Sequence, residues 1–368
     1  MMEGKLTERE AAERLGLSIR QVRRHKKRVR EEGERGVMHR SRGRASPRRV
    51  GKEVEAEVRR LYEGRYAGWN MVHFSEWLEV EHGRRLSHET VRRILVDAES
   101  RPRRRRHRKH HAWRERRSRE GELVQWDTSI HPWFGTDGEG AVLILAVDDA
   151  TSRIVWAEFF EHDGVLENRS VLRSVVRKHG LCESLYADGT SKFFLTDEDL
   201  LAARERGEDG LTQFGRVAKT LGIGMIHALS PQAKGRVERS FRTLQDRLLK
   251  ELAHLGIRTR ADGNRYLRKT FIPYYNRRFG VAPADSPSAW LRVGRLDEPN
   301  VFCLRETRRV LNDLTIPVGG ERWQLHGGVR SGERVELRTH LDARVHVYKK
   351  DQELGYHRVK RVAKAASG

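Results

Sequence analysis

The chain has 368 residues and a formal net charge of +22 at pH 7, far from the near-neutral balance of most soluble enzymes. A charge of this size is evidence about partners rather than about fold, and it favours a polyanion, most commonly nucleic acid. The sequence has no apolar run of about 18 residues and no lipidation signal, so no membrane partner is expected. Its two cysteines, Cys182 and Cys303, cannot form a disulfide framework or a cysteine-rich zinc site, which favours a cytoplasmic protein.

Residues 1–50 are predicted to form a helix-turn-helix unit. Thr7 is expected to cap a first helix, Gly16 to make a tight turn, and Ser18 to cap a basic second helix. The apolar positions are Ala11, Ala12 and Leu15 on the first helix and Val22 on the second. A short helix, a glycine turn and a basic helix are typical of units that enter the DNA major groove. Since Arg and Gln pair well with guanine and adenine, the candidates for base contact are Arg20, Gln21, Arg23 and Arg24.

Residues 51–100 repeat this pattern more loosely. Gly83 is followed by Ser87, which is expected to cap a helix with apolar positions Val91, Ile94 and Leu95. On that helix Arg92 and Arg93 would face the groove. Ordinary helical hairpins with solvated charges remain the alternative for both units.

Residues 101–120 are dominated by Lys, Arg and His, so they cannot pack as a core. This segment is interpreted as a basic linker or arm that lies along phosphates. Its histidines lack cysteine or carboxylate neighbours at ligand spacing, so a metal site is not favoured there. The arm's candidates for phosphate contact are Arg103, Arg104, Arg105 and Arg106.

Residues 121–258 differ from the preceding segments, because strands are expected here and alternate with helices. The expected strands cover 122–129, 140–151, 153–160, 183–190 and 223–229, and the expected helices cover 167–179, 211–222 and a segment that Ser230 opens. An acidic stretch, 195–210, is interpreted as a loop. The order β-β-β-α-β-α-β-α favours a mixed sheet with helices on its faces, and it resembles the ribonuclease-H-like order.

The remainder of the chain falls into two further parts. Residues 259–300 are expected to be a helical extension that ends in proline-rich turns. Residues 301–368 contain short alternating segments, which are typical of a small all-β barrel or sandwich.

Three carboxylates stand out by their place in this order. Asp127 and Asp188 are expected at strand ends, and strand ends converge on the edge where α/β folds place their sites. Glu238 lies at the margin of an apolar helical stripe and could face that edge. Three carboxylates suit Mg²⁺ or Mn²⁺, and two such ions can support an in-line phosphoryl transfer. The cations around Glu238 would then face phosphate: Lys234, Arg236 and Arg239.

A plainer interpretation exists for each acid. Glu238 lies four residues from both Lys234 and Arg242, which is ordinary ion-pair spacing on a helix. Asp127 and Asp188 could cap turns, and other acids, Asp148 and Asp149, also end a strand. Only the position of the three acids in the sheet order makes the set specific.

Four stretches together carry a family resemblance: "VQWDTS", "LYADGTSKF", "TLGIGMIHALSPQAKGRVERSFRTLQDRL" and "YYNRRFGVAPADSPSAW". They resemble bacterial insertion-sequence transposases with a retroviral-integrase-type DDE core, in the group that also carries helix-turn-helix units. The resemblance covers nearly the whole chain and implies that Asp127, Asp188 and Glu238 are the metal ligands, with Asp127 bridging two Mg²⁺ ions. The chain departs from the usual pattern at Gly189 and Thr190, and by the extra residues of 195–210.

The resemblance implies an enzyme that hydrolyses a transposon end to a 3′-hydroxyl and joins it to target DNA. Such a protein works as a homo-multimer on double-stranded DNA, associated with the bacterial nucleoid, and its helical units bind the terminal inverted repeats. Trp126 is interpreted as a core residue. Two alternatives remain: a non-catalytic DNA-binding regulator, which has no need of three acids, and a ribonuclease-H-like nuclease, which leaves the helical units and the arm unexplained.

Overall fold

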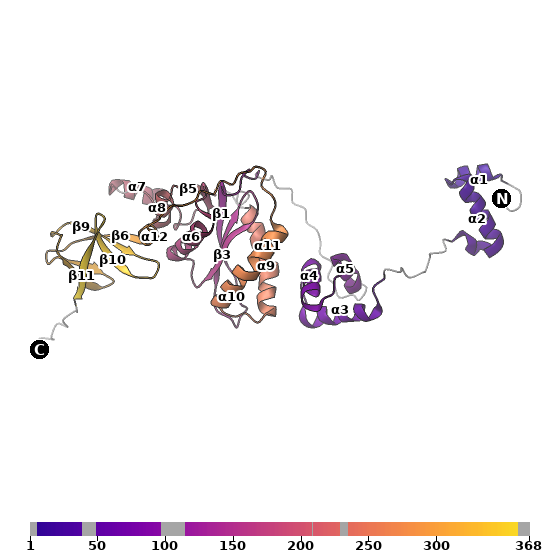
Figure 1. Cartoon of the computed structure of the whole chain (residues 1–368), viewed down its shortest axis with the longest axis horizontal. Helices are drawn as coiled ribbons and strands as arrows, with labels where there is room; N and C mark the ends of the chain where they lie inside the picture. Colours follow the sequence, from indigo (N-terminus) through magenta and orange to yellow (C-terminus); the bar gives the residue numbers. More distant parts are fainter. Residues whose placement is uncertain (1–5, 39–48, 97–114, 208, 229–234, 360–368) are drawn as a thin grey trace. The chain divides into compact units, whose positions relative to one another are not determined.

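The computed structural model describes residues 6–38, 49–96, 115–207, 209–228 and 235–359. The chain divides into two compact units, one of residues 1–66 with 90–100 and one of residues 67–89 with 101–368. Figure 1 labels the helices and strands along the chain. Within the described ranges, no helix combines the length and the apolar character needed to span a bilayer.

The first unit begins with a helical hairpin of α1 (Glu8–Leu15) and α2 (Ile19–Glu32), followed by the short helix η1 (Gly33–Val37). The predicted caps and turn are confirmed: Thr7 and Ser18 each form a capping box, and Gly16 adopts a left-handed conformation with φ 65°. Of the apolar positions of α1, its last residue, Leu15, is 64% exposed. Leu17, after the glycine turn, packs in its place against the buried Ala11, Ala12 and Val22.

Two more helices of the first unit are α3 (Lys52–Arg65) and α5 (His88–Val96). As predicted, α5 buries Val91, Ile94 and Leu95. The Arg59 side chain on α3 donates to the backbone carbonyl of Ile94 at 3.3 Å, which joins the two helices.

A mixed five-stranded sheet lies at the centre of the second unit (Figure 1). Its strands are β1 (Leu123–Ile130), β2 (Val142–Asp148), β3 (Ile154–Phe160), β4 (Ser184–Ala187) and β5 (Gly224–His227), in the order β3-β2-β1-β4-β5. The first three strands form the predicted antiparallel meander, and β4 and β5 run parallel to β1. The sheet-associated helices are α6 (Val165–His179), α7 (Asp197–Glu205), α8 (Gln213–Thr220) and α9 (Gly235–His254).

The interpretation of 195–210 as a loop is wrong, because α7 occupies part of it. Thr196 caps this helix by accepting from the Asp199 amide. The acids of its first turn, which suggested a solvated loop, favour a helix N-terminus because they interact with the helix dipole there.

Helices cover both faces of the sheet. Along β2, Ile144 and Ala146 belong to one hydrophobic cluster, while Leu143, Leu145 and Val147 belong to another. This period of two means that β2 is buried on both faces. The first cluster contains residues of α6 and α8, and it includes Trp126, as predicted. The second contains residues of α9 and of three segments after it, α10 (Arg260–Tyr266), the π-helical η3 (Leu267–Phe271) and α11 (Ile272–Phe279).

The C-terminal part begins with α12 (Glu298–Val301) and continues as one antiparallel sheet. Its strands are β6 (Leu304–Arg309), β7 (Thr315–Val318), β8 (Glu321–His326), β9 (Arg334–Thr339), β10 (Val345–Lys349) and β11 (Gln352–Val359). The strand order is β6-β9-β10-β11-β8-β7, and the two outermost strands, β6 and β7, also contact each other. The sheet therefore curls almost into a barrel, which confirms the predicted all-β class.

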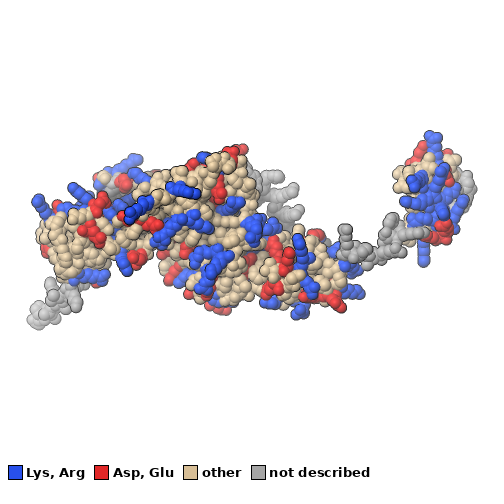
Figure 2. Space-filling model, in the orientation of Figure 1, with Lys and Arg blue, Asp and Glu red and all other residues tan. Residues whose placement is uncertain are grey.

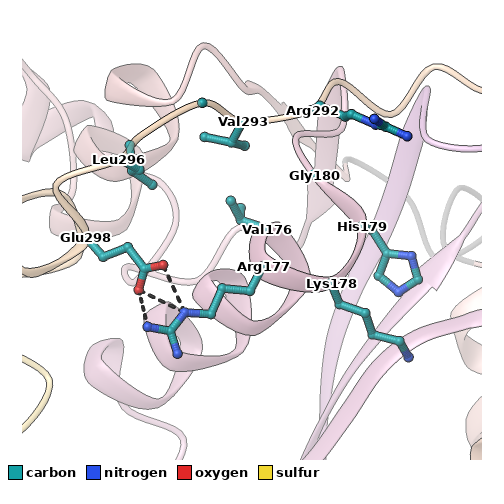
Figure 3. A pocket seen from close by; sticks show the side chains of 10 residues that line it. Val176, Arg177, Lys178, His179, Gly180, Arg292, Val293, Leu296 and Glu298 are labelled. Atoms are coloured by element: carbon teal, nitrogen blue, oxygen red, sulfur yellow. Dashed lines mark hydrogen bonds and ion pairs between the residues drawn. The ribbon is translucent and has the colours of Figure 1, made fainter.

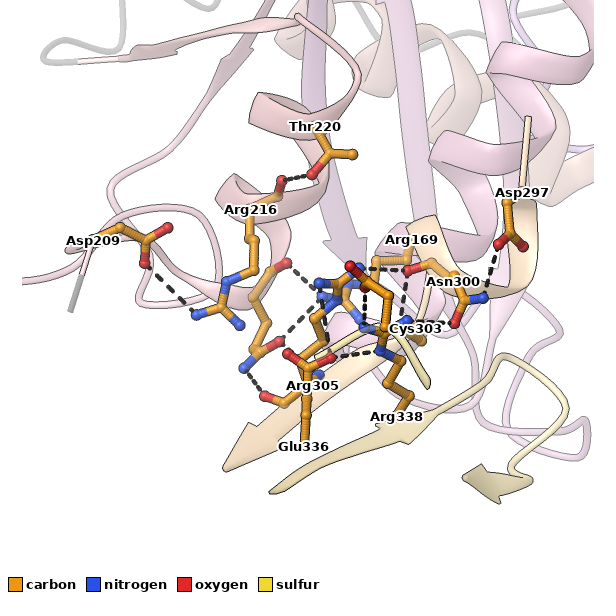
Figure 4. Close-up of polar contacts among 12 residues, drawn as sticks. Arg169, Asp209, Arg216, Thr220, Asp297, Asn300, Cys303, Arg305, Glu336 and Arg338 are labelled. Atoms are coloured by element: carbon orange, nitrogen blue, oxygen red, sulfur yellow. Dashed lines mark hydrogen bonds and ion pairs between the residues drawn. The ribbon is translucent and has the colours of Figure 1, made fainter. Parts of the chain in front are cut away.

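A buried arginine links the central sheet to this C-terminal part (Figure 4). The guanidinium of Arg169 on α6 donates to the backbone carbonyls of Gln213 and Phe302. The Gln213 side chain in turn donates to the Arg305 carbonyl at 2.6 Å and accepts from the Arg305 amide at 3.1 Å. Burial lowers the pKa of Arg169 to about 10. The first strand of the C-terminal sheet is thus held to α6 and α8 by hydrogen bonds that tolerate little displacement.

The helix α4 (Met71–His82) belongs to the second unit and is joined to α9 by polar contacts. His73 is fully buried, and its Nε2 lies 2.7 Å from Glu251 Oε1. Its Nδ1 is buried without a hydrogen-bond partner among the described residues. The neutral ring therefore donates from Nε2, and a second proton would have no acceptor. Three further contacts join the helices: Asn70 with Asp246, Glu76 with Arg247 and Glu81 with His254.

This buried histidine predicts a pH dependence of stability. Burial lowers the pKa of His73 below its ordinary value of 6.5, although the hydrogen bond to Glu251 opposes the shift. The unfolded chain then binds the proton more readily than the folded one, so stability is lost as the pH falls below about 6.5. Calorimetric melting between pH 7.5 and 5.0 should show a steeper fall for the wild type than for His73→Gln. The exposed His162 provides the control, since His162→Gln should follow the wild-type curve. Parallel curves for wild type and His73→Gln would contradict the assignment.

Candidate active site

Asp127 and Asp188 lie at the same level of neighbouring parallel strands. In the pairing of β1 with β4, Leu123 is opposite Ser184 and Gln125 is opposite Tyr186. Continuing this register by two residues brings Asp127 opposite Asp188, on strands about 4.8 Å apart. Asp188 directly follows β4, as predicted. Asp127 does not end its strand, because β1 continues to Ile130 through its pairing with β2.

The two acids also share a face of the sheet. Trp126 and Ala187, the residues just before them, both belong to the cluster that contains α6 and α8. Because side chains alternate along a strand, Asp127 and Asp188 are directed to the opposite face, which α9 covers. Both acids are half-buried.

The residues after Asp188 explain the departure from the expected motif. The Thr190 hydroxyl donates to Asp188 Oδ1 at 2.9 Å and so orients the carboxylate. At Gly189, a Cβ atom would lie 2.3 Å from Nε2 of His227, a residue of β5. A side chain at this position would force the exposed His227 ring, which stacks on Phe194, to move.

Glu238 lies exposed in the first described turn of α9. The predicted helix start at Ser230, and Lys234 with it, lie outside the described residues. The Val237 amide donates to the Gln125 side chain at 3.0 Å. Gln125 lies two residues before Asp127 on the same strand, so the first described turn of α9 lies beside the strand that carries the first acid.

No three Asp, Glu, His or Cys side chains within the described ranges lie close enough together to hold a metal ion. The β1–β4 register, extended by two residues, thus brings Asp127 opposite Asp188, and the Val237 contact ties the first described turn of α9 to β1. Among the residues described, the three acids do not form one cluster. Their chemistry nevertheless fits Mg²⁺ or Mn²⁺, which prefer carboxylate oxygens.

One predicted phosphate contact needs correction. The guanidinium of Arg236 donates to Asp149 Oδ1 at 2.7 Å, with its side chain only 12% exposed and that of Asp149 fully buried. Arg236 is therefore held inside the protein, because losing either partner would leave the other charge buried and unpaired. Arg239 is exposed on the same helix.

The α1–α2 hairpin presents a dense group of Lys and Arg side chains (Figure 2). Arg20 and Arg24 are exposed, and Arg23 is also exposed while its Nε donates to Glu8 at 2.7 Å. Gln21 is different, because its side-chain oxygen accepts from the Ser18 amide at 2.9 Å and from the Ser18 hydroxyl at 3.0 Å. Gln21 thus has a capping role, and its contact with bases stays a prediction.

In α5, Arg93 is exposed and Arg92 is half-buried. The predicted arm residues Arg103, Arg104, Arg105 and Arg106 lie outside the described residues. For the second helical unit, only the position of Arg93 thus bears on the prediction, and it is compatible with a contact to DNA.

These positions predict how substitutions change DNA binding. Arg20→Ala or Arg24→Ala should weaken binding to a duplex carrying the element's end by about 1–3 kcal/mol if the side chain contacts a base. Gln21→Ala should mainly lower the melting temperature, because it removes half of a capping box. Fluorescence anisotropy and thermal melting of the three variants separate the two effects. A larger loss of affinity for Gln21→Ala than for both arginine variants would contradict this assignment.

A pocket of about 400 Å³ lies at the C-terminal end of α6 (Figure 3). Among the described residues that line this pocket, the one carboxylate, that of Glu298, is paired with Arg177, whose Nε donates to it at 2.9 Å. Figure 3 shows Lys178 and His179 directed away from the middle of the pocket. None of the three predicted acids lines it, so we do not assign the chemistry to this pocket.

Comparisons with known proteins agree with this architecture. A homeodomain-like domain family matches residues 21–95. A homeodomain-like domain at this position indicates a DNA-binding protein. Over 364 residues the chain is 35% identical to the putative transposase y4bF of Sinorhizobium fredii, covering 97% of this chain and 78% of that protein. It is 31% identical to the transposase for insertion sequence IS1202 of Streptococcus pneumoniae, covering 76% of this chain and 66% of that protein. The chain therefore belongs to the family of insertion-sequence transposases, as the sequence motifs indicated.

Solved structures that resemble the chain are retroviral. One is a simian T-cell lymphotropic virus intasome in complex with the PP2A regulatory subunit B56 gamma, with a TM-score of 0.36, 14% identity, and coverage of 77% of this chain and 94% of that chain. Another is the HTLV-2 integrase catalytic core domain in complex with magnesium, with a TM-score of 0.32, 14% identity, and coverage of 46% and 96%. The family assignment rests on the two transposases and not on these structures.

Proposed function

We propose that this transposase binds the terminal inverted repeats of an insertion sequence, hydrolyses each end to a 3′-hydroxyl, and joins that hydroxyl to target DNA. The residues that would hold two Mg²⁺ or Mn²⁺ ions are Asp127, Asp188 and Glu238. The observation that carries the proposal is the β1–β4 register, which, if extended by two residues, would bring Asp127 opposite Asp188 on the sheet face that α9 covers. The strand order β3-β2-β1-β4-β5 with α9 on that face supports a ribonuclease-H-like catalytic core at 121–258.

The protein's own residues would act by binding and orientation. Asp127 and Asp188 would hold divalent ions beside one phosphate, and Thr190 would hold the Asp188 carboxylate in one orientation. Bound divalent ions would activate the attacking oxygen and stabilise the leaving oxygen. Glu238 would complete the ligand set from α9, with Arg239 near the phosphate backbone.

The rest of the chain would bind and position the DNA. Residues 1–50 and 51–100 would bind the terminal repeats, and the arm at 101–120 would add phosphate contacts whose strength falls with salt. Residues 259–300 and 301–368 would form the helical extension and the small β-barrel domain. The transposase would act as a homo-multimer, because two ends must be held together before they are joined to one target.

One observation favours a second function, a DNA-binding regulator without catalysis. Glu238 is exposed, and the three acids do not form a cluster in the described part of the chain. A regulator derived from a transposase would show the same features.

End processing by the wild-type protein distinguishes these functions. A labelled duplex carrying the element's end is incubated with the protein and Mg²⁺, or with EDTA in place of Mg²⁺. A transposase should give a hydrolysed 3′ end and a joined product in Mg²⁺, and neither product in EDTA. Binding without cleavage would support the regulator, and equal cleavage of unrelated duplexes or RNA–DNA hybrids would support a nuclease.

A further inference from the structure

A fully buried carboxylate, Asp149, joins three segments of the catalytic part of the chain. Asp149 follows β2, and its Oδ1 accepts from Gln125 Nε2 at 2.6 Å and from Arg236 Nη1 at 2.7 Å. Its Oδ2 accepts from the Arg117 amide at 2.8 Å. These partners belong to β1, to α9 and to the segment that precedes β1. One side chain therefore connects the segment before β1, β1 itself and the helix that carries Glu238.

Gln125 extends this network to the backbone of α9. Its Nε2 donates to Asp149, and its Oε1 accepts from the Val237 amide at 3.0 Å. Gln125 therefore holds the first described turn of α9 from the neighbouring strand. Because one end of the Gln125 amide must donate and the other must accept, its orientation is fixed.

The network lies between the proposed catalytic acids. Gln125 is two residues before Asp127 and shares its face of β1, and Val237 immediately precedes Glu238. Gln125 and Asp149 are fully buried, and buried polar groups of this kind tolerate few alternative arrangements once all are paired. We propose that Asp149, through Gln125 and Arg236, is a positioning residue that sets the first described turn of α9 and so places Glu238 relative to Asp127. This inference rests on the proposed function, since it assumes that Glu238 is a metal ligand.

The adjacent residue provides a matched control. Asp148 is also fully buried, but its carboxylate accepts from the Gly121 amide at 2.9 Å, and from the Thr151 amide and hydroxyl at 2.8 and 2.6 Å. None of these three partners belongs to α9. Asp148→Asn should therefore perturb the turn between β2 and β3 and leave α9 in place.

The test compares full-length Asp149→Asn, Asp148→Asn and Gln125→Glu with the double variant Gln125→Glu/Asp149→Asn. Hydrogen exchange at Val237 should be at least about 10-fold faster in Asp149→Asn, and the half-saturating Mg²⁺ concentration for strand transfer should rise about 10-fold or more. Affinity for the element's end should stay within about 2-fold of the wild type, because the DNA-binding helices are unchanged. Gln125→Glu places two carboxylates together, and the double variant should recover part of the loss because donor and acceptor are exchanged.

The outcomes separate this inference from the proposed function. Unchanged exchange at Val237 in Asp149→Asn, or an equal rise in the Mg²⁺ requirement of Asp148→Asn, would overturn the positioning role. If the wild type shows no Mg²⁺-dependent joining, the proposed function fails. The exchange measurement would still decide whether Asp149 holds α9, because it requires no catalysis.

Discussion

Replacing Asp127 or Asp188 with asparagine should lower strand transfer by more than about 100-fold, beyond the 10- to 100-fold loss usual for residues that only support metal ligands. Asparagine keeps the size of the side chain and removes the charge that a hard divalent ion requires. Binding to the element's end should not change, since the proposed function assigns that binding to the helical units. Strand transfer and fluorescence anisotropy, measured on the same preparations, report the two properties separately.

The control for this pair is Asp137→Asn, which removes an exposed carboxylate between β1 and β2. It should leave both joining and binding close to wild type. If either Asp127→Asn or Asp188→Asn retains joining near the level of this control, that residue is not a ligand.

The second large effect concerns stability and the buried guanidinium of Arg169. Arg169→Ala should lower the free energy of unfolding by about 3 kcal/mol or more, because it leaves a cavity and removes charged hydrogen bonds to the Gln213 and Phe302 carbonyls. Urea unfolding of the full chain, followed by circular dichroism and tryptophan fluorescence, measures this change.

Arg177 is the matched control, since it lies on the same helix and also contacts the segment before β6. Its partner is Glu298, and its side chain is 59% exposed. A surface ion pair of this kind contributes about 0–1 kcal/mol, so Arg177→Ala should have a small effect. Equal losses for Arg169→Ala and Arg177→Ala would show that the buried contacts do not hold the C-terminal sheet.

Features that depend on neighbouring residues could be predicted from the sequence. The caps at Thr7 and Ser18 and the turn at Gly16 follow from side-chain chemistry within a few positions, and the structure confirms them. The order of strands and helices in the central sheet was also predictable, because buried strands and amphipathic helices have different hydrophobic periods. That order was sufficient to single out Asp127 and Asp188 among many acids.

Features that depend on distant residues could not be predicted in this way. Asp149 contacts Gln125 and Arg236, which lie 24 and 87 residues away, so its role becomes visible only in the folded chain. The same applies to Arg236, which the sequence assigned to phosphate. The helix α7 was a different kind of error, since Thr196 followed by acids is a helix-start signal that could have been recognised.

The most direct test of the account is strand transfer by the wild type and by Glu238→Gln, on a duplex that carries the element's end, in Mg²⁺ and in EDTA. The account predicts joining by the wild type in Mg²⁺ only, and its loss in Glu238→Gln with end binding retained. A Glu238→Gln variant that joins DNA as well as the wild type would remove Glu238 from the site. A wild type that binds the end and never joins it would contradict the catalytic assignment and leave a DNA-binding regulator.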